Sequence, residues 1–564
     1  MNLQQQDNSV QLFPFVQQSF AGGINTAVPN ELVGDTEAVD ILNFEYADDD
    51  DLYTRPGINE WSTEIFPSRI TSLHYYENED GDISILATSK DKLYASPNFN
   101  PVWDDITASL NLPDNKFWMW RNWQGYAIGA THGADGNPTA VYPIKFDGTT
   151  ASVLTNAPRA KYLEVWNERL WIVSAEDPNV IYGSGLGNPE AWTVDGADDA
   201  VIIDVGKNDG DKITGIYAFR GQLFIFKRTK IYTIKALDGT IPTDVGNLYV
   251  DLYTANIGCI SQYTIQAILD DVLFLSDSGI ASLTNAPLGE LKTALISQKV
   301  KELKNILKNS LEISSLVIEK ANQYWLMVPS GMSTRGESEI YVFDIRRIQE
   351  GFVRWIRFNG LIAGTVACNY YVNGIRNVLI GATDRKVYEY IPGLLQRAAL
   401  WDEGSWDISY WDDDINANTF LDGAEPIHKR IRTKTYDFDS PFIYKLFHRW
   451  GLDTSLLSDD VLITVNYFIN RSPLRGGTYN LPFARTPDLS LWDNGVWDVS
   501  DWDGQRTVVE DLTAIRQFLR DNTRKGTNVT FVIDNTQNRG FVIKSILLQF
   551  APLNHRRVND IGVV

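Results

Sequence analysis

The amino-acid sequence predicts an all-β protein: a β-propeller of about six to eight blades, then a C-terminal β-sandwich-like module, with few short helices. A pair of short strands returns along most of the chain, and the residue pattern changes after Pro392. In the clearest copy, residues 216–234, three apolar–polar alternations are joined by two tight turns. Period-two alternation buries one face of each strand, and tight turns make neighbouring strands antiparallel. Such meanders must stack around an axis to bury their apolar faces.

The composition supports a large folded protein. The chain has 564 residues, of which 44% are hydrophobic and 12% aromatic, and this amount of apolar surface argues against disorder. Its formal net charge of −22 argues against binding of duplex DNA by a generally basic surface, which needs many lysines and arginines. Cys259 and Cys368 both fall in expected strands and are interpreted as two buried thiols, with one disulfide as the alternative. No secretory signal or apolar run of membrane-spanning length occurs, so we expect no stable membrane insertion.

The first 66 residues precede the repeats. Residues 1–36 are polar and are expected to form an N-terminal arm. Residues 37–66 are expected to form a strand, 38–46, which can close the propeller ring, and a hairpin whose tip holds four aspartates, 48–51. These aspartates could bind Ca²⁺, but they lack the spacing and the glycine of a calcium loop, so a solvated turn is favoured.

Residues 67–395 are assigned to the propeller. The repeated strand pairs of this region are irregularly spaced, and seven repeats can be counted. The expected blade cores are residues 73–96, 119–146, 163–184, 216–234, 265–283, 316–343 and 366–390.

One segment of this region, 291–307, breaks the strand pattern and predicts a helix with an apolar stripe. The lysines off that stripe are either solvated or form a basic strip that faces DNA. They are Lys292, Lys299, Lys301, Lys304 and Lys308.

Residues 396–564 form the predicted C-terminal β-rich module, with a short helix near 512–522. It contains two similar segments, 400–412 and 491–503, which are identical at nine of thirteen positions and hold six of the seventeen tryptophans. A spacing of five residues places successive rings on opposite strand faces, which disfavours a flat sugar-binding platform. Packing between modules or subunits is the favoured role, because indoles contribute strongly to interfaces. The candidate interface residues are Gly22, Gly23, Trp401, Trp406, Trp411, Trp492, Trp497 and Trp502.

Recognisable catalytic patterns are absent from the sequence. It contains no nucleophile elbow, no His-Glu-x-x-His and no clustered Cys/His ligands, and its five histidines are scattered. The sequence therefore predicts a protein that is not an enzyme and that has no cofactor and no metal site.

Three short N-terminal motifs carry a family resemblance: Phe20-Ala-Gly-Gly-Ile-Asn, Ala38-Val-Asp-Ile-Leu-Asn-Phe and Arg55-Pro-Gly. Gly22 and Gly23 permit a positive-φ bend, and Pro56-Gly57 permits a turn into the first blade. These motifs, with 432–439 and 540–550 near the end, resemble the tail nozzle or hub proteins of short-tailed bacteriophages, the tail tubular protein B-like family.

The resemblance implies a structural virion protein, assembled in the host cytoplasm and located in the virion tail. Its implied partners are copies of itself in a ring, most often a homohexamer, the head-to-tail adaptor, tail fibres or tailspikes, and DNA in transit through the lumen. Six acidic chains would repel phosphate and keep DNA from adhering to the channel. The alternative is a receptor-binding or fibre-anchoring module that engages host glycans through its Trp-rich segments.

Overall fold

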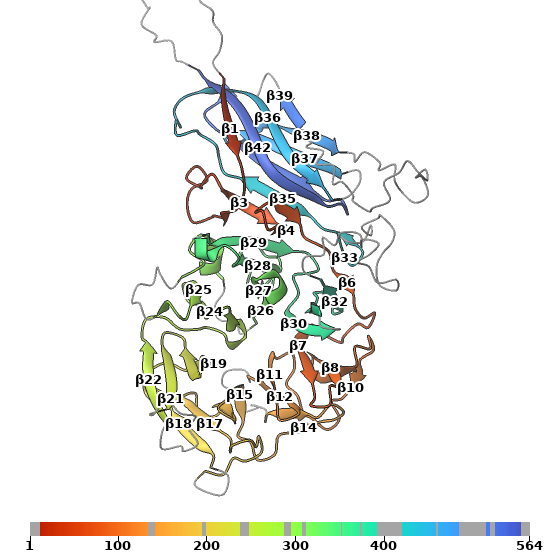
Figure 1. The fold of residues 1–564 in the computed structure, drawn as a ribbon, viewed down its shortest axis with the longest axis vertical. Helices are drawn as coiled ribbons and strands as arrows, with labels where there is room; N and C mark the ends of the chain where they lie inside the picture. Colours follow the sequence, from red (N-terminus) through yellow and green to blue (C-terminus); the bar gives the residue numbers. More distant parts are fainter. Residues whose placement is uncertain are drawn as a thin grey trace, which may run out of the picture. The chain divides into compact units, whose positions relative to one another are not determined.

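The computed structural model describes residues 12–132, 142–194, 199–236, 248–286, 295–306, 312–350, 352–372, 375–391, 420–457, 461–483, 515–518 and 525–553. The chain divides into two compact units. Unit 1 comprises Met1–Gly57, Arg347–Arg357 and Leu394–Val564, and unit 2 comprises Ile58–Arg346 and Phe358–Gly393. The described elements are β-strands and short 3-10 turns, which confirms the all-β prediction (Figure 1).

Unit 2 is a β-propeller, as predicted. Its described residues form seven sets of consecutive antiparallel strands, numbered here as blades 1 to 7, and each expected blade core falls in one of them. Blade 1 contains β7(Ile70–Glu77), β8(Ile83–Ser89), β9(Lys92–Pro97) and β10(Asp104–Asp105), and blade 2 contains β11(Trp118–Trp123), β12(Tyr126–Thr131), β13(Ile144–Phe146) and β14(Ala151–Val153). Blade 3 contains β15(Ala160–Trp166), β16(Arg169–Ser174), β17(Val180–Gly183) and β18(Val201–Asp204), and blade 4 contains β19(Ile213–Phe219), β20(Gln222–Lys227), β21(Ile231–Ala236) and β22(Leu248–Thr254). Blade 5 contains β23(Gln266–Ile268), β24(Asp271–Ser276) and β25(Gly279–Ser282), and blade 6 contains β26(Ser314–Ile318), β27(Gln323–Val328) and β28(Glu339–Asp344). Blade 7 contains β30(Val366–Val372), β31(Ile375–Gly381) and β32(Val387–Tyr390).

The ring is closed by a two-residue strand from the N-terminal side. β6(Asn59–Glu60) pairs antiparallel with β32, placing Glu60 opposite Tyr388 and completing blade 7. Lys386 forms an ion pair with Glu60 at 3.0 Å beside this junction. The prediction that residues 38–46 close the ring is therefore wrong. Those residues form strands of unit 1 that are buried along almost their whole length, which requires packing partners on both faces.

Unit 1 contains two packed sheets. In the first, the strand order is β39(Ile515–Phe518), β36(Lys445–Leu456), β42(Phe541–Pro552), β5(Leu52–Thr54) and β4(Phe44–Tyr46), with β1(Phe13–Gln17) on β42 and β40(Lys525–Gly526) on β36. The second contains β29(Arg354–Asn359), β3(Glu37–Leu42), β35(Lys429–Thr433), β41(Val529–Asn535), β37(Val461–Ile469) and β38(Ser472–Phe483), with β2(Gly23–Ile24) on β3.

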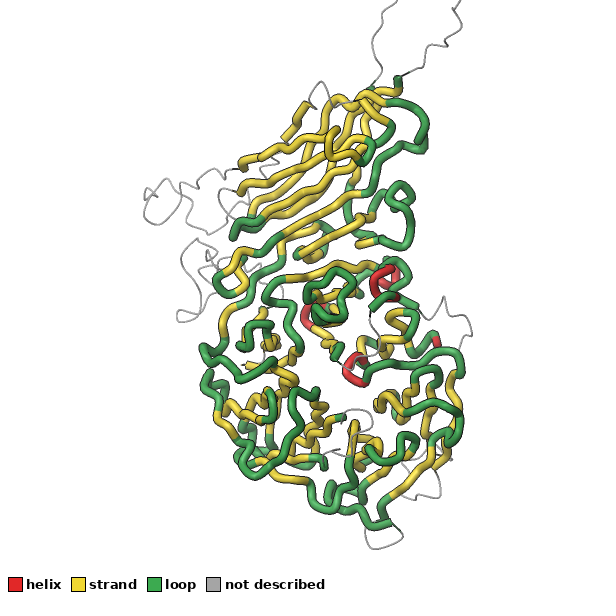
Figure 2. Tube along the Cα trace, turned by 180° about the vertical axis from the view of Figure 1, so that it is seen from behind, coloured by secondary structure: helices red, strands yellow, loops and turns green. Residues whose placement is uncertain are grey.

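Trp450 of the first sheet packs against two rings of the second, Phe531 at 5.6 Å and Tyr479 at 5.5 Å between centroids. The two sheets thus share an aromatic core, and the long strands of this unit are visible in Figure 2. The predicted β-sandwich-like module is present, but it does not consist of C-terminal residues alone. β1, within the predicted arm, pairs with β42 from Phe13 opposite Phe550 to Gln17 opposite Ile546. Residues of the N-terminal arm and hairpin are therefore structural strands of the sandwich.

Both predicted helices need correction. Within residues 295–306 no α-helix is present: the Ile296 amide donates to the Ile280 carbonyl at 2.9 Å, and the chain then makes a 3-10 turn, η4(Lys301–Lys304). The apolar side chains that become buried are Val300, Leu303 and Ile306, whose spacing of three matches the 3-10 repeat rather than an α-helical stripe. In the second case, residues 515–518 form β39, which pairs with β36.

Candidate functional site

The two glycines of the first N-terminal motif allow close packing inside unit 1. Gly23 has φ +73°, and a Cβ atom there would lie 2.6 Å from the Trp355 amide nitrogen. A Cβ atom on Gly22 would lie 2.6 Å from the Glu37 side chain. The expected positive-φ bend is therefore present at Gly23, and both glycines leave room for neighbouring chain segments.

Asp40 of the second motif lies between two arginines. Its Oδ1 accepts hydrogen bonds from Arg357 at 3.0 and 2.7 Å, and its Oδ2 accepts hydrogen bonds from Arg430 at 3.2 and 2.8 Å. Asp40 and Arg357 are buried. A buried carboxylate needs such compensation, and this arrangement joins three neighbouring strands, β29, β3 and β35.

The third motif forms a second buried ion pair. The Arg55 guanidinium donates to Asp422 through Nη1 at 2.8 Å and Nη2 at 2.6 Å, and through Nε to Asn43 at 3.0 Å. A Cβ atom on Gly57 would lie 1.8 Å from the Leu421 carbonyl oxygen, so only glycine fits there. Burial, reinforced by Arg55, lowers the pKa of the nearby Lys429 to about 7. We call the residues Asp40, Asn43, Arg55, Arg357, Asp422 and Arg430 the charge cluster of unit 1.

The aspartate tip is not simply a solvated turn. Asp50 has φ +70° and forms ion pairs with Arg354 at 2.6 Å and Arg347 at 2.9 Å. Burial, and then the neighbouring charge of Asp49, raises the pKa of Asp51 to about 6. Across the described parts of the chain, no group of three or more His, Cys, Asp or Glu side chains is arranged to hold a metal ion.

The centre of the propeller is crossed by Tyr263, from the turn η2(Gln262–Thr264) that leads into blade 5. Its hydroxyl donates to the carbonyl of Phe117, at the entry of blade 2, at 2.7 Å. Its ring packs 5.5 Å from that of Phe117 and 6.4 Å from that of Tyr162 in blade 3. Because blades 2 and 5 are not neighbours in the ring, these contacts span the middle of the propeller.

A second contact between non-adjacent blades lies at the same end of the inner strands. Arg69, just before β7, makes a two-point ion pair with Glu312, just before β26, at 2.7 and 2.8 Å. The hydrogen bonds from Arg69 are the main cause of the lowered pKa of Glu312. Tyr263 and the Arg69–Glu312 pair therefore brace the ring from inside.

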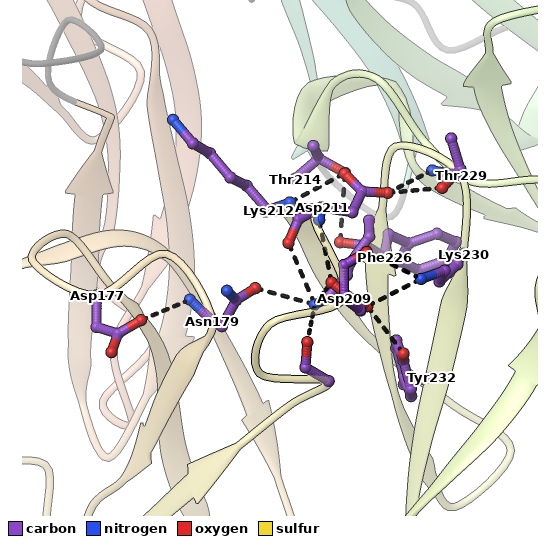
Figure 3. A network of polar contacts seen from close by, with 12 residues as sticks. Asp177, Asn179, Asp209, Asp211, Lys212, Thr214, Phe226, Thr229, Lys230 and Tyr232 are labelled. Carbon is purple, nitrogen blue, oxygen red and sulfur yellow. Dashed lines mark hydrogen bonds and ion pairs between the residues drawn. The ribbon is translucent and has the colours of Figure 1, made fainter.

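A buried lysine, Lys227, joins blades 3 and 4. Its partners Asn179 and Asp209 are labelled in the polar network of Figure 3. The Lys227 ammonium is fully buried and donates to Asn179 Oδ1 and Asp209 Oδ1 at 2.9 Å each, and to the Gly206 and Asp211 carbonyls. Burial alone would raise the pKa of Asp209, but hydrogen bonds from Lys227, from the Asp211 amide and from Tyr232 outweigh it and bring the pKa to about 2. This network has the features of a structural staple, a contact that holds two blades together: its ammonium is fully buried and bonds at short range to a carboxylate of opposite charge.

The remaining predicted site residues are only partly described. Lys301 and Lys304 are exposed on η4 and Lys299 is half-buried next to it, so the three do not lie along a helix as predicted. Lys292, Lys308 and all six candidate interface tryptophans lie outside the described residues. Cys259 and Cys368 are buried and not joined by a disulfide, which confirms the interpretation as two thiols, and burial raises the pKa of each to about 12.

Sequence reasoning missed the most distinctive polar residues. Lys227, Tyr263 and Asp422 have no motif around them, and their partners are distant in the sequence. In the described segments, no helix has the length and hydropathy that crossing a bilayer requires.

No protein-family model matches the chain, and no curated protein matches it. Among solved structures it is similar to BBS1N, solved in complex with ARL6DN, at 13% identity over 60% of this chain and 99% of that chain, with a TM-score of 0.36. It is also similar to YCF48 from Cyanidioschyzon merolae, at 10% identity over 60% of this chain and 99% of that chain, with a TM-score of 0.36. A third similar structure is apo AztD from Citrobacter koseri, at 10% identity over 56% of this chain and 85% of that chain, with a TM-score of 0.28.

Proposed function

We propose that this chain is a structural virion protein: the nozzle or hub of a short phage tail, in which six copies form a ring around the DNA-ejection channel below the head-to-tail adaptor. The main support comes from the structural roles of the residues that bear the family resemblance. Gly23, Asp40, Asn43, Arg55 and Gly57 all serve close packing or buried ion pairs within unit 1. A motif whose members are all used to build a framework fits a scaffold better than an enzyme.

Side-chain contacts across the centre of the propeller affect where the path of DNA can lie in the proposed ring. Tyr263 reaches across the middle of the ring, and the Arg69–Glu312 pair braces the end at which the inner strands begin. A ring braced in this way is suited to be a rigid wall element. In the proposed function the channel is therefore enclosed between copies of the chain, and DNA does not run through a single propeller.

The charge of the chain suits this role. Each copy carries a formal charge of −22, so a ring of copies would repel phosphate and let DNA slide without adhering. The partners proposed are copies of the chain, the adaptor, and tail fibres or tailspikes. The alternative of glycan recognition by the Trp-rich segments depends on residues outside the described part of the chain and stays a prediction.

The test is the stoichiometry of the assembled chain. Purified protein would be analysed by native mass spectrometry and electron microscopy, alone and after mixing with the adaptor ring encoded by the same phage genome. We expect a ring with six times the 63.6 kDa chain mass on the adaptor. A trimer, or a chain that stays monomeric in the presence of the adaptor, would overturn the proposal.

A further inference from the structure

Two buried side chains of unit 1 face each other across neighbouring strands. Lys429 is the first residue of β35 and Asn535 is the last residue of β41, and the two are directly opposite in the antiparallel register. Lys429 has no exposed surface, and Asn535 is only 3% exposed. The Lys429 Nζ atom lies 3.3 Å from Asn535 Oδ1. An amine and a carboxamide are therefore in contact at a place that is shielded from solvent.

Three oxygen atoms surround the Lys429 nitrogen. Besides Asn535 Oδ1, they are the backbone carbonyl oxygens of Gln537 at 2.5 Å and Arg539 at 2.9 Å. A protonated ammonium group donates to all three, whereas a neutral amine has two N–H groups and one lone pair. Two N–H groups would keep the two shorter contacts, to the backbone carbonyls. The lone pair of the neutral amine then points at the Asn535 amide, which makes the longest of the three contacts.

The surroundings of Lys429 favour this neutral amine. Burial, reinforced by the charge of Arg55, lowers the pKa of Lys429 to about 7, against the opposing charge of Asp422. The Asp422 carboxylate is itself paired with Arg55, and among the described residues Lys429 has no carboxylate within ion-pair distance. Desolvation and a neighbouring cation are the two influences that make a lysine nucleophilic near neutral pH.

The Asn535 carboxamide is held by hydrogen bonds at both of its polar atoms. Its Nδ2 donates to the Leu462 carbonyl at 2.9 Å, and its Oδ1 accepts from the Gln537 amide at 3.2 Å. A donor on the carbonyl oxygen stabilises the negative charge that develops there when a nucleophile attacks the carbonyl carbon. The amide is therefore fixed in one orientation beside the amine, with its carbonyl polarised.

We propose that Lys429 and Asn535 become joined by an isopeptide bond once unit 1 has folded. The Lys429 nitrogen attacks the side-chain carbonyl carbon of Asn535, and a bond forms between these two atoms. The bond from that carbon to Nδ2 breaks, one proton of the attacking nitrogen passes to Nδ2, and the group leaves as ammonia. One amide replaces another, so the step needs no oxidant, reductant or second substrate.

The bond gives the sandwich a covalent tie between β35 and β41. The two residues are 106 positions apart in the sequence, and closing so long a loop restricts the unfolded chain more than the folded one. Cys259 and Cys368 form no disulfide, so the tie does not duplicate one between them. Both Lys429 and Asn535 lie within unit 1 of one chain, so the inference does not depend on the proposed ring.

Lys227 offers a comparison within the same chain. Its ammonium lies 2.9 Å from Asn179 Oδ1, so a buried lysine again faces a side-chain amide. Unlike Lys429, it also pairs with a carboxylate, that of Asp209, at 2.9 Å. An ammonium in an ion pair has no lone pair with which to attack an amide carbon. We therefore expect no bond between Lys227 and Asn179.

The test is peptide mapping of the purified full chain by mass spectrometry after digestion with trypsin. Trypsin releases Asn535 in the segment 526–539 and does not cleave after an acylated Lys429. We expect the segment 526–539 to be joined to the segment that ends at Arg430. The mass of the joined peptide should be about 17 Da below the sum of its two parts, which is the mass of the ammonia lost.

Two variants make the test specific. Asn535→Ala removes the amide that is attacked, and the two segments should then be recovered unlinked. Asn179→Ala is the matched control, because it removes the amide beside Lys227 and should leave the link at Lys429 intact. Thermal unfolding shows whether each variant is folded, and the parent chain by itself decides whether the bond exists. In the digest of the parent chain, the segments of Lys227 and Asn179 should be separate peptides.

Two results would overturn the proposal. One is recovery of the two segments of the parent chain only as separate peptides, which would show that Lys429 and Asn535 are no more than a hydrogen-bonded pair. The other is a link to Lys429 that persists in Asn535→Ala, since the amine would then be joined to a different residue.

Discussion

The Arg55 guanidinium and the Asp422 carboxylate form a buried two-point ion pair although 367 residues separate them in the chain. Arg55 directly follows β5, and Asp422 lies in the two-residue strand β33(Leu421–Asp422). The pair therefore ties the first part of the chain to the last part within unit 1. It gives a physical role to the Arg-Pro-Gly motif, which sequence analysis interprets as a turn.

Arg55→Met should lower the free energy of unfolding by about 3–5 kcal/mol, because it leaves the Asp422 carboxylate buried without its partner. Urea unfolding followed by tryptophan fluorescence measures the change. The double variant Arg55→Met/Asp422→Leu should regain much of the loss, since it removes the buried charge as well. Lys235→Met, at a half-exposed ion pair with Asp251, is the control and should leave the midpoint unchanged. An Arg55→Met variant as stable as the parent chain would contradict the inferred role of the pair.

The blades could be predicted from the sequence because each is built from local information. Alternating residues and tight turns recur within about twenty-five residues, and seven such cores correspond to the seven sets of antiparallel strands in unit 2. The closing strand β6 could not be predicted, since two residues, Asn59 and Glu60, are too few to show any period. The helix predicted at 291–307 failed because Val300, Leu303 and Ile306, with their spacing of three, are buried by a 3-10 turn.

The polar clusters were harder to predict than the strands. An ion pair has no periodic pattern, and the partners of Asp40 and Arg55 are far away in the sequence. The glycines Gly23 and Gly57 were recognised through short motifs, but the backbone atoms they must accommodate, of Trp355 and Leu421, were not foreseeable. Tertiary contacts of this kind appear only when the sheets have been assembled.

Lys227→Met should destabilise unit 2 by about 3–5 kcal/mol at neutral pH, because Asp209 loses its main buried partner. The lowered pKa of Asp209 means that its contribution is fully present above its ordinary value near 3.8 and is lost as the pH falls through about 2. Thermal unfolding between pH 2 and 7 should therefore show a shallower acid dependence for Lys227→Met than for the parent chain. Lys230→Met, whose ammonium lies 3.4 Å from Asp209 and is partly exposed, should have the smaller effect. An equal loss of stability in the two variants would contradict the structural role inferred for Lys227.

Tyr263→Phe should cost about 1 kcal/mol, because it removes the hydroxyl that donates to the Phe117 carbonyl across the centre of the propeller. Tyr263→Ala should cost about 3–5 kcal/mol, because it also removes the ring packed against Phe117 and Tyr162. Urea unfolding of the two variants measures both steps. Tyr253→Phe is the matched control, since its hydroxyl also donates to a backbone carbonyl, that of Leu283, but over a longer 3.3 Å. If Tyr253→Phe lowers the free energy of unfolding as much as Tyr263→Phe or more, the inference that Tyr263 braces the propeller is wrong.

Asp51→Asn should make the protein more stable at pH 7.5 and leave its stability unchanged near pH 3. Burial, followed by the charges of Asp49, Asp453 and Asp50 against one nearby cation, Lys544, raises the pKa of Asp51 from 3.8 to about 6. The folded protein therefore holds this proton more tightly than the unfolded chain does, so the contribution is present below about pH 3.8 and is lost as the pH rises through about 6.

Asparagine imitates the protonated form, and because the side chain is half-exposed, screening reduces the expected gain at pH 7.5 to about 1 kcal/mol. Urea midpoints at the two pH values measure it, with Asp80→Asn, on an exposed turn of unit 2, as the control for the loss of one negative charge. A gain of the same size at both pH values would show that the titration of Asp51 is not its cause, since asparagine and protonated aspartate carry the same charge and an effect of titration is confined to the pH range in which Asp51 is ionised.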